Sequence, residues 1–307
     1  MNTKIKVVGI GGSGGNAVSR MKKCKIQGVE LIAINSDAQD LKKIRADQKI
    51  RIGRKLTQGL GTGMNPETGK RAAEEQREEI QEVLKGSDMV FVTYGVGGGT
   101  GSGAGPVVAE IAKNLGALTV AIVTKPFSFE GKTRMEIAEA GIRKLKEKVD
   151  SLIVIENDKL LENLDPKTTV ISAFWICDDI LREAVQGISN LIILPGIINV
   201  DFADVKTILR DSGTALFGMG WAKGEKRAQT ALKNALSSPL LNISPKGARG
   251  ILFNVSGGKD ISLSEIEEMG KILTQEINPE AKVIFGAAQD EKLKKGEIKV
   301  MVIATGF

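Results

Sequence analysis

The chain has 307 residues, of which 42% are hydrophobic and 26% charged, an ordinary composition for a globular protein with room for two domains. Histidine is absent and the only cysteines are Cys24 and Cys177, which excludes a Ser-His triad, a histidine general base and a zinc site built from these ligands. The net charge is +6, but aromatic residues make up only 4% and no recognition-helix or RNA-binding motif occurs, so we expect no nucleic-acid partner.

No apolar run approaches the roughly 20 residues that cross a bilayer, and the N-terminus lacks a signal-peptide pattern. Two cysteines fit a reducing compartment, and both are expected to be packing residues. We therefore expect a cytoplasmic protein without direct membrane insertion.

The first predicted strand, at residues 4–10, runs into a glycine-rich segment at 11–16, after which a helix begins near Ala17. Gly9, at the end of this strand, together with Gly11 and Gly14 matches the G-x-G-x-x-G fingerprint of dinucleotide-binding proteins. The next strand, at 30–34, ends in Asn35-Ser36-Asp37, where such a protein places an acidic residue against a ribose. Taken alone, this stretch favours an NAD-dependent oxidoreductase, which is the competing hypothesis.

A second glycine loop, at residues 57–66, precedes a glutamate-rich helical run, and a third follows the apolar strand predicted at 89–94. The third loop, Gly95–Gly103, contains six glycines, and Pro106 behind it is typical of a first helical turn. Glycines let backbone N–H groups approach an anion, and a helix N-terminus adds its positive dipole, so the loop predicts a phosphate site. No Lys-Ser or Lys-Thr pair closes the loop, so it is not a Walker A motif.

Further strands are predicted at 119–123 and 151–155, alternating with helices. This alternation indicates a parallel sheet whose C-terminal edge gathers the three glycine loops around one polyphosphate. A simple dinucleotide site does not need the loop at 95–103. The chain also lacks an evident catalytic His, Cys or Tyr-x-x-x-Lys, which weakens the oxidoreductase hypothesis.

Apolar residues at three- and four-residue spacing predict a long helix at about 169–194, stopped by Pro195-Gly196. A helix of about 25 residues spans nearly 40 Å, enough to join two domains. Beyond it the glycine loops disappear, which indicates a smaller α/β domain with a mixed sheet. Its predicted strands lie at 214–220, 250–256, 283–287 and 298–305, with helices at 226–237 and 264–276.

The run Gly97–Gly103 reads GGGTGSG, the tubulin signature, and Asn199–Val205 resembles the N-V-D-F-A-D-V loop of FtsZ. The similarity covers essentially the whole chain, which therefore resembles the FtsZ family of tubulin-like cell-division GTPases. The resemblance implies a Rossmann-like, parallel-sheet GTP-binding domain at 1–168 and a central helix at 169–196. It also implies a smaller mixed-sheet α/β domain, the GTPase-activating C-terminal domain, at 197–307.

In the family, the glycine loops surround the phosphates of GTP or GDP, with Mg²⁺ alongside. By position, Glu130 and Arg134 resemble the pair that holds the ribose, with Asn157 contributing. Phe174 resembles the residue that stacks on guanine, and Asp178 the acceptor for guanine N–H groups. The binding residues that the resemblance implies are Gly11, Gly12, Ser13, Asn16, Gly97, Gly98, Gly99, Thr100, Gly101, Ser102, Gly103, Glu130, Arg134, Asn157, Phe174 and Asp178. Taken singly, Phe174 is more often a core residue, and Glu130 with Arg134 a surface pair.

Catalysis is expected from Asn199, Asp201 and Asp204. In FtsZ this loop reaches the nucleotide of the next subunit, so GTP is hydrolysed only in a head-to-tail filament, the basis of the division ring. The residues alone fit ordinary turn or capping positions equally well. Two alternatives stay open: a plasmid-segregating or cell-shape tubulin relative, and a filament former that uses GTP only as a ligand.

The chain departs from the family pattern at several positions. Tyr94 stands where a small residue is usual, Gly105 where alanine is typical, Glu156 where proline is common, and the helix start at Trp175–Cys177 is bulky. The basic net charge also differs from the usually acidic FtsZ cores. The family's C-terminal tail, which binds division-ring adaptors, is not in this sequence, so adaptor contacts at the division site are expected through such a segment.

Overall fold

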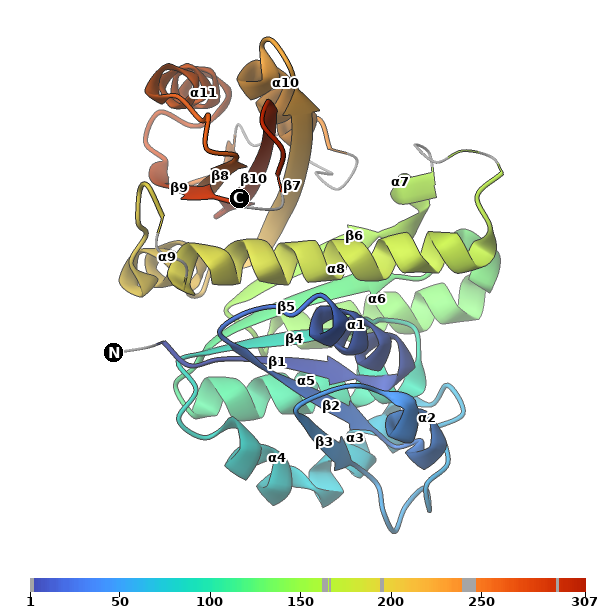
Figure 1. The fold of residues 1–307 in the computed structure, drawn as a ribbon. Coiled ribbons are helices and arrows are strands. Elements are labelled where there is room, and N and C mark those ends of the chain that lie inside the picture. Colours follow the sequence, from blue (N-terminus) through green and yellow to red (C-terminus); the bar gives the residue numbers. More distant parts are fainter. Residues whose placement is uncertain (1–2, 162–164, 166, 194–195, 239–246, 291–292) are drawn as a thin grey trace. The chain divides into compact units, whose positions relative to one another are not determined.

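The computed structural model describes residues 3–161, 165, 167–193, 196–238, 247–290 and 293–307 (Figure 1). The chain divides into two compact units, Met1–Ser189 and Asn190–Phe307. The boundary lies inside one long helix. None of the helices in the described part of the chain has the length and apolar character that crossing a bilayer requires.

The first unit is built on a parallel sheet. Its strands are β1 (Ile5–Ile10), β2 (Val29–Asn35), β3 (Gln48–Arg51), β4 (Met89–Gly95), β5 (Leu118–Lys125) and β6 (Ser151–Glu156), in the order β3-β2-β1-β4-β5-β6. The inner strands are apolar runs because both faces of the sheet are covered: every residue from Met89 to Tyr94 is buried. The edge strand β3 is polar and mostly exposed.

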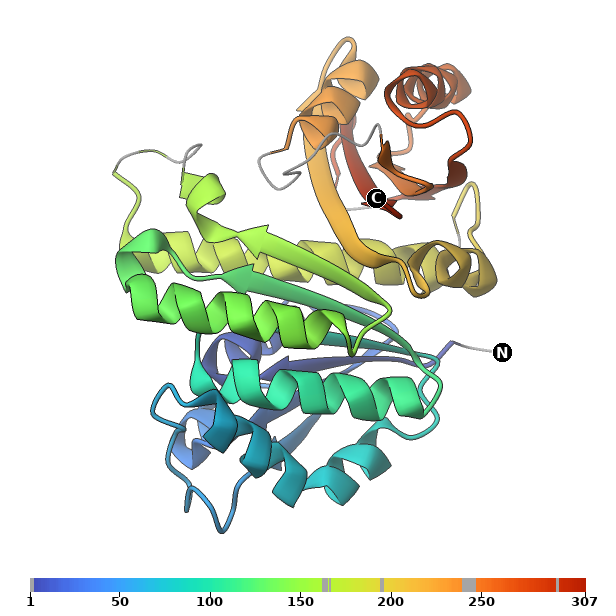
Figure 2. The ribbon, with the colours of Figure 1, turned by 180° about the vertical axis from the view of Figure 1, so that it is seen from behind.

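Helices cover the two faces of this sheet. On one face lie α1 (Gly11–Lys23), α2 (Ala38–Lys43) and the long α8 (Val170–Ile193) (Figure 1). On the other lie α3 (Pro66–Glu75), α4 (Arg77–Leu84), α5 (Gly99–Asn114) and α6 (Lys132–Lys146) (Figure 2). The chain runs outward from β1 in one direction and from β4 in the other. The crevice between the C-terminal ends of β1 and β4 is therefore the topological switch point, where open α/β sheets bind ligands.

The helices after β1 and β4 begin earlier than the sequence predicts. α1 starts at Gly11 rather than near Ala17, and α5 starts at Gly99, so the glycine runs form first helical turns. Pro106, expected in the first turn, lies inside α5.

Close helix packing explains why glycines continue into α5. A Cβ at Gly103 would lie 2.0 Å from the carbonyl oxygen of Pro66, and one at Gly69 would lie 2.3 Å from that of Gly99. The backbones of α3 and α5 are therefore in direct contact. Helix propensity, which ranks glycine low, is overridden here by tertiary packing.

The predicted central helix is present as α8, and its predicted end at Pro195 lies outside the described residues. Its 24 residues correspond to about 36 Å. Cys177, Leu181, Ala184 and Ile188 form the expected buried stripe. Phe174, at the start of that pattern, is instead 41% exposed.

The second unit has a mixed sheet, as the sequence predicts. Its strands are β7 (Gly213–Lys223), β8 (Gly250–Gly257), β9 (Lys282–Gln289) and β10 (Glu297–Thr305), in the order β7-β10-β8-β9, with β8 and β9 parallel and the other pairs antiparallel. The apolar core forms between this sheet, α10 (Arg227–Leu236) and α11 (Leu263–Glu276). The short helix α9 (Phe202–Leu209) contacts β8 and β9.

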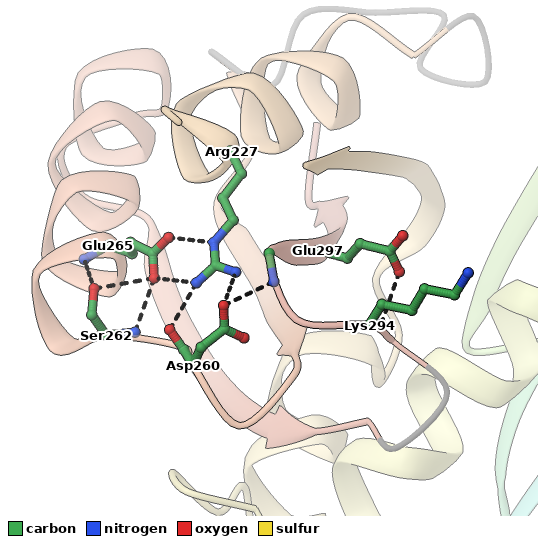
Figure 3. Close-up of polar contacts among 7 residues, drawn as sticks. Arg227, Asp260, Ser262, Glu265, Lys294 and Glu297 are labelled. Carbon is green, nitrogen blue, oxygen red and sulfur yellow. Dashed lines mark hydrogen bonds and ion pairs between the residues drawn. The ribbon is translucent and has the colours of Figure 1, made fainter. Parts of the chain in front are cut away.

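In the second unit, a buried arginine pairs with two carboxylates from other segments (Figure 3). The Arg227 side chain, on α10, pairs with Asp260 at 2.8 Å and donates to Glu265 Oε2 at 2.9 Å. Asp260 also accepts the N–H of Gly296 at 2.8 Å, and Glu265 forms a capping box with Ser262 at the start of α11. The hydrogen bond from Arg227 is the main cause that lowers the pKa of Glu265. The cluster ties α10, α11 and the turn before β10 together.

Candidate functional site

Two helix N-termini meet at the switch point of the first unit. The Ser13 hydroxyl, in the first turn of α1, accepts the N–H of Gly95 at the end of β4, at 2.7 Å. A Cβ at Gly11 would lie 3.5 Å from the backbone nitrogen of Gly101 in α5. The free N–H groups and positive dipole ends of both helices therefore converge on one place, which favours an anion there.

The Thr100 hydroxyl, in the first turn of α5, lies close to hydroxyls from two other loops. It lies 3.1 Å from the Ser36 hydroxyl after β2 and 3.2 Å from the Thr62 hydroxyl in the loop before α3. The loops after β2 and β4 and the loop at 57–65 thus share one edge of the sheet, as the sequence predicts. Ser36 and Thr62 were not singled out from the sequence, although the loops that carry them were.

Three further sequence-predicted residues share one side of α1. Gly12, Ser13 and Asn16 are exposed, whereas Gly11, Gly14 and Gly15 are buried. Positions three and four apart face the same way on a helix, so Ser13 and Asn16 present polar groups to the same side as the open backbone of Gly12.

In the turn from β4 into α5, some residues leave space for a ligand and others fix the shape of the turn. Gly97 has φ +97°, and a Cβ there would lie 2.8 Å from the carbonyl oxygen of Arg134, so only glycine fits. Gly98 has open space around it. The Ser102 hydroxyl accepts the N–H of Gly97 at 2.9 Å, and Gly103 lies against α3. These contacts give Ser102 and Gly103 a role in holding the turn.

Glu130, just before α6, and Arg134, in its first turn, lie together beside the turn at Gly97. Arg134 pairs with Glu130 at 2.8 Å, and Glu130 also accepts the N–H of Phe127 at 2.9 Å. The segment is held from a second side, because the N–H of Ser128 donates to Asp158 at 2.9 Å. Asp158 lies on α7 (Asn157–Leu161), directly after β6.

Asn157 begins α7 with its side chain 4% exposed, and its Oδ1 has no hydrogen-bond partner among the described residues. A buried polar atom without a partner is unfavourable, so Asn157 fits a ligand that supplies a donor. Glu156, which replaces the family's proline, instead pairs with Lys125 at 3.4 Å and Lys159 at 3.6 Å.

Phe174 and Asp178 lie one turn apart on α8. Phe174 packs edge-on against Phe127, with ring centroids 5.2 Å apart, and leaves part of its ring exposed. Burial raises the pKa of Asp178 to about 6, with Arg20 acting to lower it and Asp179 to raise it. Arg20 was missed from the sequence, although it lies four residues after Asn16, one turn further along α1.

Asn199, Asp201 and Asp204 belong to the second unit. Asp201 is the N-cap of α9 and accepts the N–H of Ala203 at 3.2 Å, and Asn199 accepts the N–H of Gly196 at 2.7 Å. Asp204 lies in the first turn of α9, and all three residues are exposed. Asp201 and Asn199 therefore have the local roles expected of capping residues, and the carboxylate of Asp204 faces solvent.

The described residues contain no group of three or more Asp, Glu, Cys or His side chains that could hold a metal ion. The hydroxyls of Ser36, Thr62 and Thr100 lie together at the N-terminus of α5 and offer hard oxygen donors. Hard oxygens suit Mg²⁺, which commonly keeps water and substrate phosphates as ligands.

Comparison with known proteins finds similar domains and similar folds. A family model described as the Tubulin/FtsZ family, GTPase domain, matches residues 4–165, and one described as the FtsZ family, C-terminal domain, matches residues 213–307. The chain is 47% identical to FtsZ of M. jannaschii, solved as an empty dimer, with a TM-score of 0.95 over 100% of this chain and 89% of that chain.

The fold is also similar to that of two proteins from Haloferax volcanii. CetZ1, a GDP-bound monomer, is 22% identical, with a TM-score of 0.86 over 99% of this chain and 94% of that one. CetZ2, a GTPγS-bound protofilament, is 21% identical, with a TM-score of 0.84 over 98% and 92%.

Proposed function

The chain belongs to the FtsZ family of tubulin-like GTPases, and we propose that it assembles head to tail and hydrolyses GTP between successive subunits. The observation that carries this proposal is that the candidate residues are divided between the two units of the chain. Every residue proposed to hold the nucleotide belongs to the first unit, whereas Asn199, Asp201 and Asp204 are exposed on the second. A site completed by another copy makes assembly a condition of catalysis, and a heterologous contact of this kind continues into an open filament. The solved relatives described as a dimer and a protofilament support self-association.

The phosphates are assigned to the two converging helix N-termini. Gly11, Gly12 and Ser13 from α1, with the turn at Gly97–Gly101, offer backbone N–H groups where glycine lets a ligand approach closely. Mg²⁺ would be held by phosphate oxygens, water and the hydroxyls around Thr100, and it would neutralise charge that develops on the phosphates.

The nucleoside is assigned to the far end of the same site. The Glu130–Arg134 pair faces the ribose, and the exposed part of Phe174 provides a stacking surface for the base. Asn157, whose Oδ1 has no partner within the described part of the chain, and the carboxylate of Asp178 accept guanine N–H groups. This set favours guanine over adenine because two acceptors meet the N1–H and amino group of guanine.

In hydrolysis, the loop of the second unit completes the site of the neighbouring subunit. Asp201 and Asp204 orient a water molecule whose oxygen attacks the γ-phosphorus, while the bond from phosphorus to the β–γ bridging oxygen breaks. GDP and phosphate leave, and the water proton passes to a carboxylate or to the phosphate formed. Positioning and charge stabilisation supply most of the rate.

A mixing experiment tests whether the site is shared. An Asp204→Ala variant keeps its nucleotide site but lacks the loop carboxylate, whereas an Asp178→Ala variant keeps the loop. Each alone is expected to hydrolyse GTP slowly, and their mixture to regain activity as total concentration rises, because interfaces form between an intact nucleotide site and an intact loop. A mixture no more active than the sum of its parts, together with wild-type specific activity that is independent of concentration, would contradict the proposal. Filaments in electron micrographs without phosphate release would select the non-hydrolysing filament former.

A role in cell division, in the cytoplasm at the division site, is part of the proposal. The 47% identity to an FtsZ, against 21–22% to the CetZ proteins, supports this role. Division-ring adaptors are proposed to bind through a C-terminal tail outside this sequence.

A further inference from the structure

Trp175 is an exposed aromatic residue with a fixed partner. Its side chain is 57% exposed at the start of α8, next to Phe174, where the family pattern lacks so bulky a residue. The guanidinium carbon of Arg20 lies 3.6 Å from the centroid of the indole, and Arg20 Nη1 donates to the carbonyl oxygen of Trp175 at 2.8 Å. Trp175 therefore holds the Arg20 guanidinium twice: its indole makes a cation–π contact, and its backbone carbonyl accepts a hydrogen bond.

The other terminal nitrogen of Arg20 is directed to Asp178. Arg20 Nη2 lies 3.4 Å from Asp178 Oδ2, and the two side chains are 10% and 16% exposed. Arg20 Nε is buried without a hydrogen-bond partner among the described residues, so the guanidinium depends on Trp175 and Asp178 for its contacts. The indole covers one face of the guanidinium, which keeps water from screening the charge pair.

We propose that Trp175 is a positioning residue for base recognition, which acts through Arg20 to keep the Asp178 carboxylate ionised and oriented toward guanine. The inference rests on the proposed function, because it takes Asp178 as the acceptor for the base. The charged groups that act on Asp178 are Arg20 from α1, which contacts it, and Asp179 from its own helix, so Arg20 is the counterion that opposes both burial and Asp179.

The protonation state of Asp178 decides which base fits. An ionised carboxylate has only acceptors, and guanine offers it the N1–H and an amino N–H. A protonated carboxyl has one donor and one acceptor, the pattern that complements N1 and the amino group of adenine. Loss of the Trp175 contact is therefore expected to weaken guanine binding and to leave adenine binding unchanged or stronger, with the shift largest at low pH.

The experiment measures the dissociation constants of GDP and ADP by calorimetry between pH 5 and 8 on the full chain. Diphosphates are used because they are not hydrolysed. The variants are Trp175→Ala, Trp175→Phe and Asp178→Ala, and the matched control is Trp221→Ala, which removes the other tryptophan, 47% exposed on β7 of the second unit.

For Trp175→Ala, the GDP dissociation constant should rise roughly fivefold near pH 5, the size expected for one cation–π contact, and by less at pH 7, where Asp178 is mostly ionised. The pH midpoint of GDP binding should also move upward. Trp175→Phe should restore much of both, since a phenyl ring also holds a cation, and the control should change neither. If Trp175→Ala does not fold, as judged by circular dichroism, Arg20→Gln takes its place with the same expected shifts.

Two results separate this inference from the proposed function. If Asp178→Ala loses the preference for GDP over ADP while Trp175→Ala and Arg20→Gln leave both the preference and the pH midpoint unchanged, the role of Trp175 is overturned and that of Asp178 stands. If Asp178→Ala keeps the preference, the base assignment itself is wrong.

Discussion

The ring of Tyr94 occupies the space that a side chain at position 105 would need. A Cβ at Gly105 would lie 2.3 Å from Cε1, Cζ and the hydroxyl oxygen of Tyr94, which is itself fully buried. The ring also lies under Gly101, whose Cβ would be 2.8 Å from Tyr94 Cδ2. Two departures from the family pattern are thus one packing arrangement: a large residue at the end of β4 matches a missing side chain on α5. The first turns of α5 rest on this ring.

Gly105→Ala should destabilise the protein by about 2 kcal/mol, because the added methyl group overpacks a filled core. The same substitution combined with Tyr94→Ala should be less harmful than the sum of the two single changes, since the cavity left by the ring accepts the methyl group. Urea unfolding of the four proteins of this double-mutant cycle measures the coupling. Additive effects would show that the two positions do not share the space.

Tyr94→Phe should have a different result. The Tyr94 hydroxyl is buried without a hydrogen-bond partner among the described residues, and burial raises the pKa of the phenol well above its ordinary value. Removing it leaves no group unpaired, so stability should change by less than about 0.5 kcal/mol or increase. A loss of more than about 1 kcal/mol in the same urea assay would indicate a bound partner such as a buried water.

Guanine binding should depend on pH through Asp178. Its pKa is raised to about 6, so the carboxylate that accepts guanine is ionised above that pH and is lost below it. GDP affinity should be constant above about pH 7 and fall toward pH 5, approaching tenfold per unit below the midpoint. The contribution of Asp178 to folding stability changes with pH in the opposite direction to GDP affinity. A raised carboxyl pKa contributes stability that is fully present below the unfolded value of 3.8 and is lost as pH rises through 6. Calorimetric titrations across this range check the affinity, and a flat profile would contradict the role of Asp178.

Asp204→Ala should leave GTP binding nearly unchanged and slow hydrolysis by roughly a hundredfold or more, the range seen when a group that orients the attacking species is removed. Phosphate release and nucleotide binding are measured separately. Asp201 requires a conservative change, because it also caps α9 and its loss to alanine costs about 1 kcal/mol of stability. Asp201→Asn keeps a side-chain acceptor for the helix and removes the charge. Abolished binding in either variant would place these residues in the nucleotide site of their own subunit.

Arg227→Met should destabilise the second unit by about 3 kcal/mol at neutral pH, because two carboxylates then lose their common counterion. Arg227 is the main cause that lowers the pKa of Glu265, whereas the N–H of Gly296 is the main cause at Asp260 and Arg227 adds to it. The stability that these carboxylates contribute is present above the ordinary pKa values of 4.5 and 3.8 and disappears as pH falls through the folded pKa values. The gap between variant and wild type should therefore shrink below about pH 4. Thermal unfolding at pH 7 and pH 3 makes the comparison, and an equal gap at both would contradict the electrostatic account.

The sequence predicted the elements well where a local pattern determines them. Apolar runs identified five of the six strands of the first unit, all but the short β3. Apolar residues at three- and four-residue spacing identified α8. Helix starts were predicted less well, because the glycines at 11–16 and 99–105 look like loops to any local rule. Contacts between residues far apart in the sequence hold them in helices: the α5 glycines pack against α3 and Tyr94, and Gly14 of α1 packs against the carbonyl oxygen of Thr93.

In the candidate site, too, local features were predicted and long-range contacts were not. The loops that form it were read from their glycines and from the family signature. The contacts that fix its geometry were not, since Thr100 with Thr62 and Arg20 with Asp178 join segments 38 and 158 residues apart. Trp175 was noticed only as unusual, and its partner on α1 explains its presence.

The switch point between β1 and β4 lies between two layers of helices, with α1 and α8 on one face of the sheet and α5 and α6 on the other. A nucleotide bound there, as proposed, would contact both layers and connect them. At a concentration one hundred times its dissociation constant, such a ligand adds about 2.7 kcal/mol to stability. The guanine nucleotide pool of the cell would then influence how long each folded copy survives proteolysis, as well as whether it joins a filament.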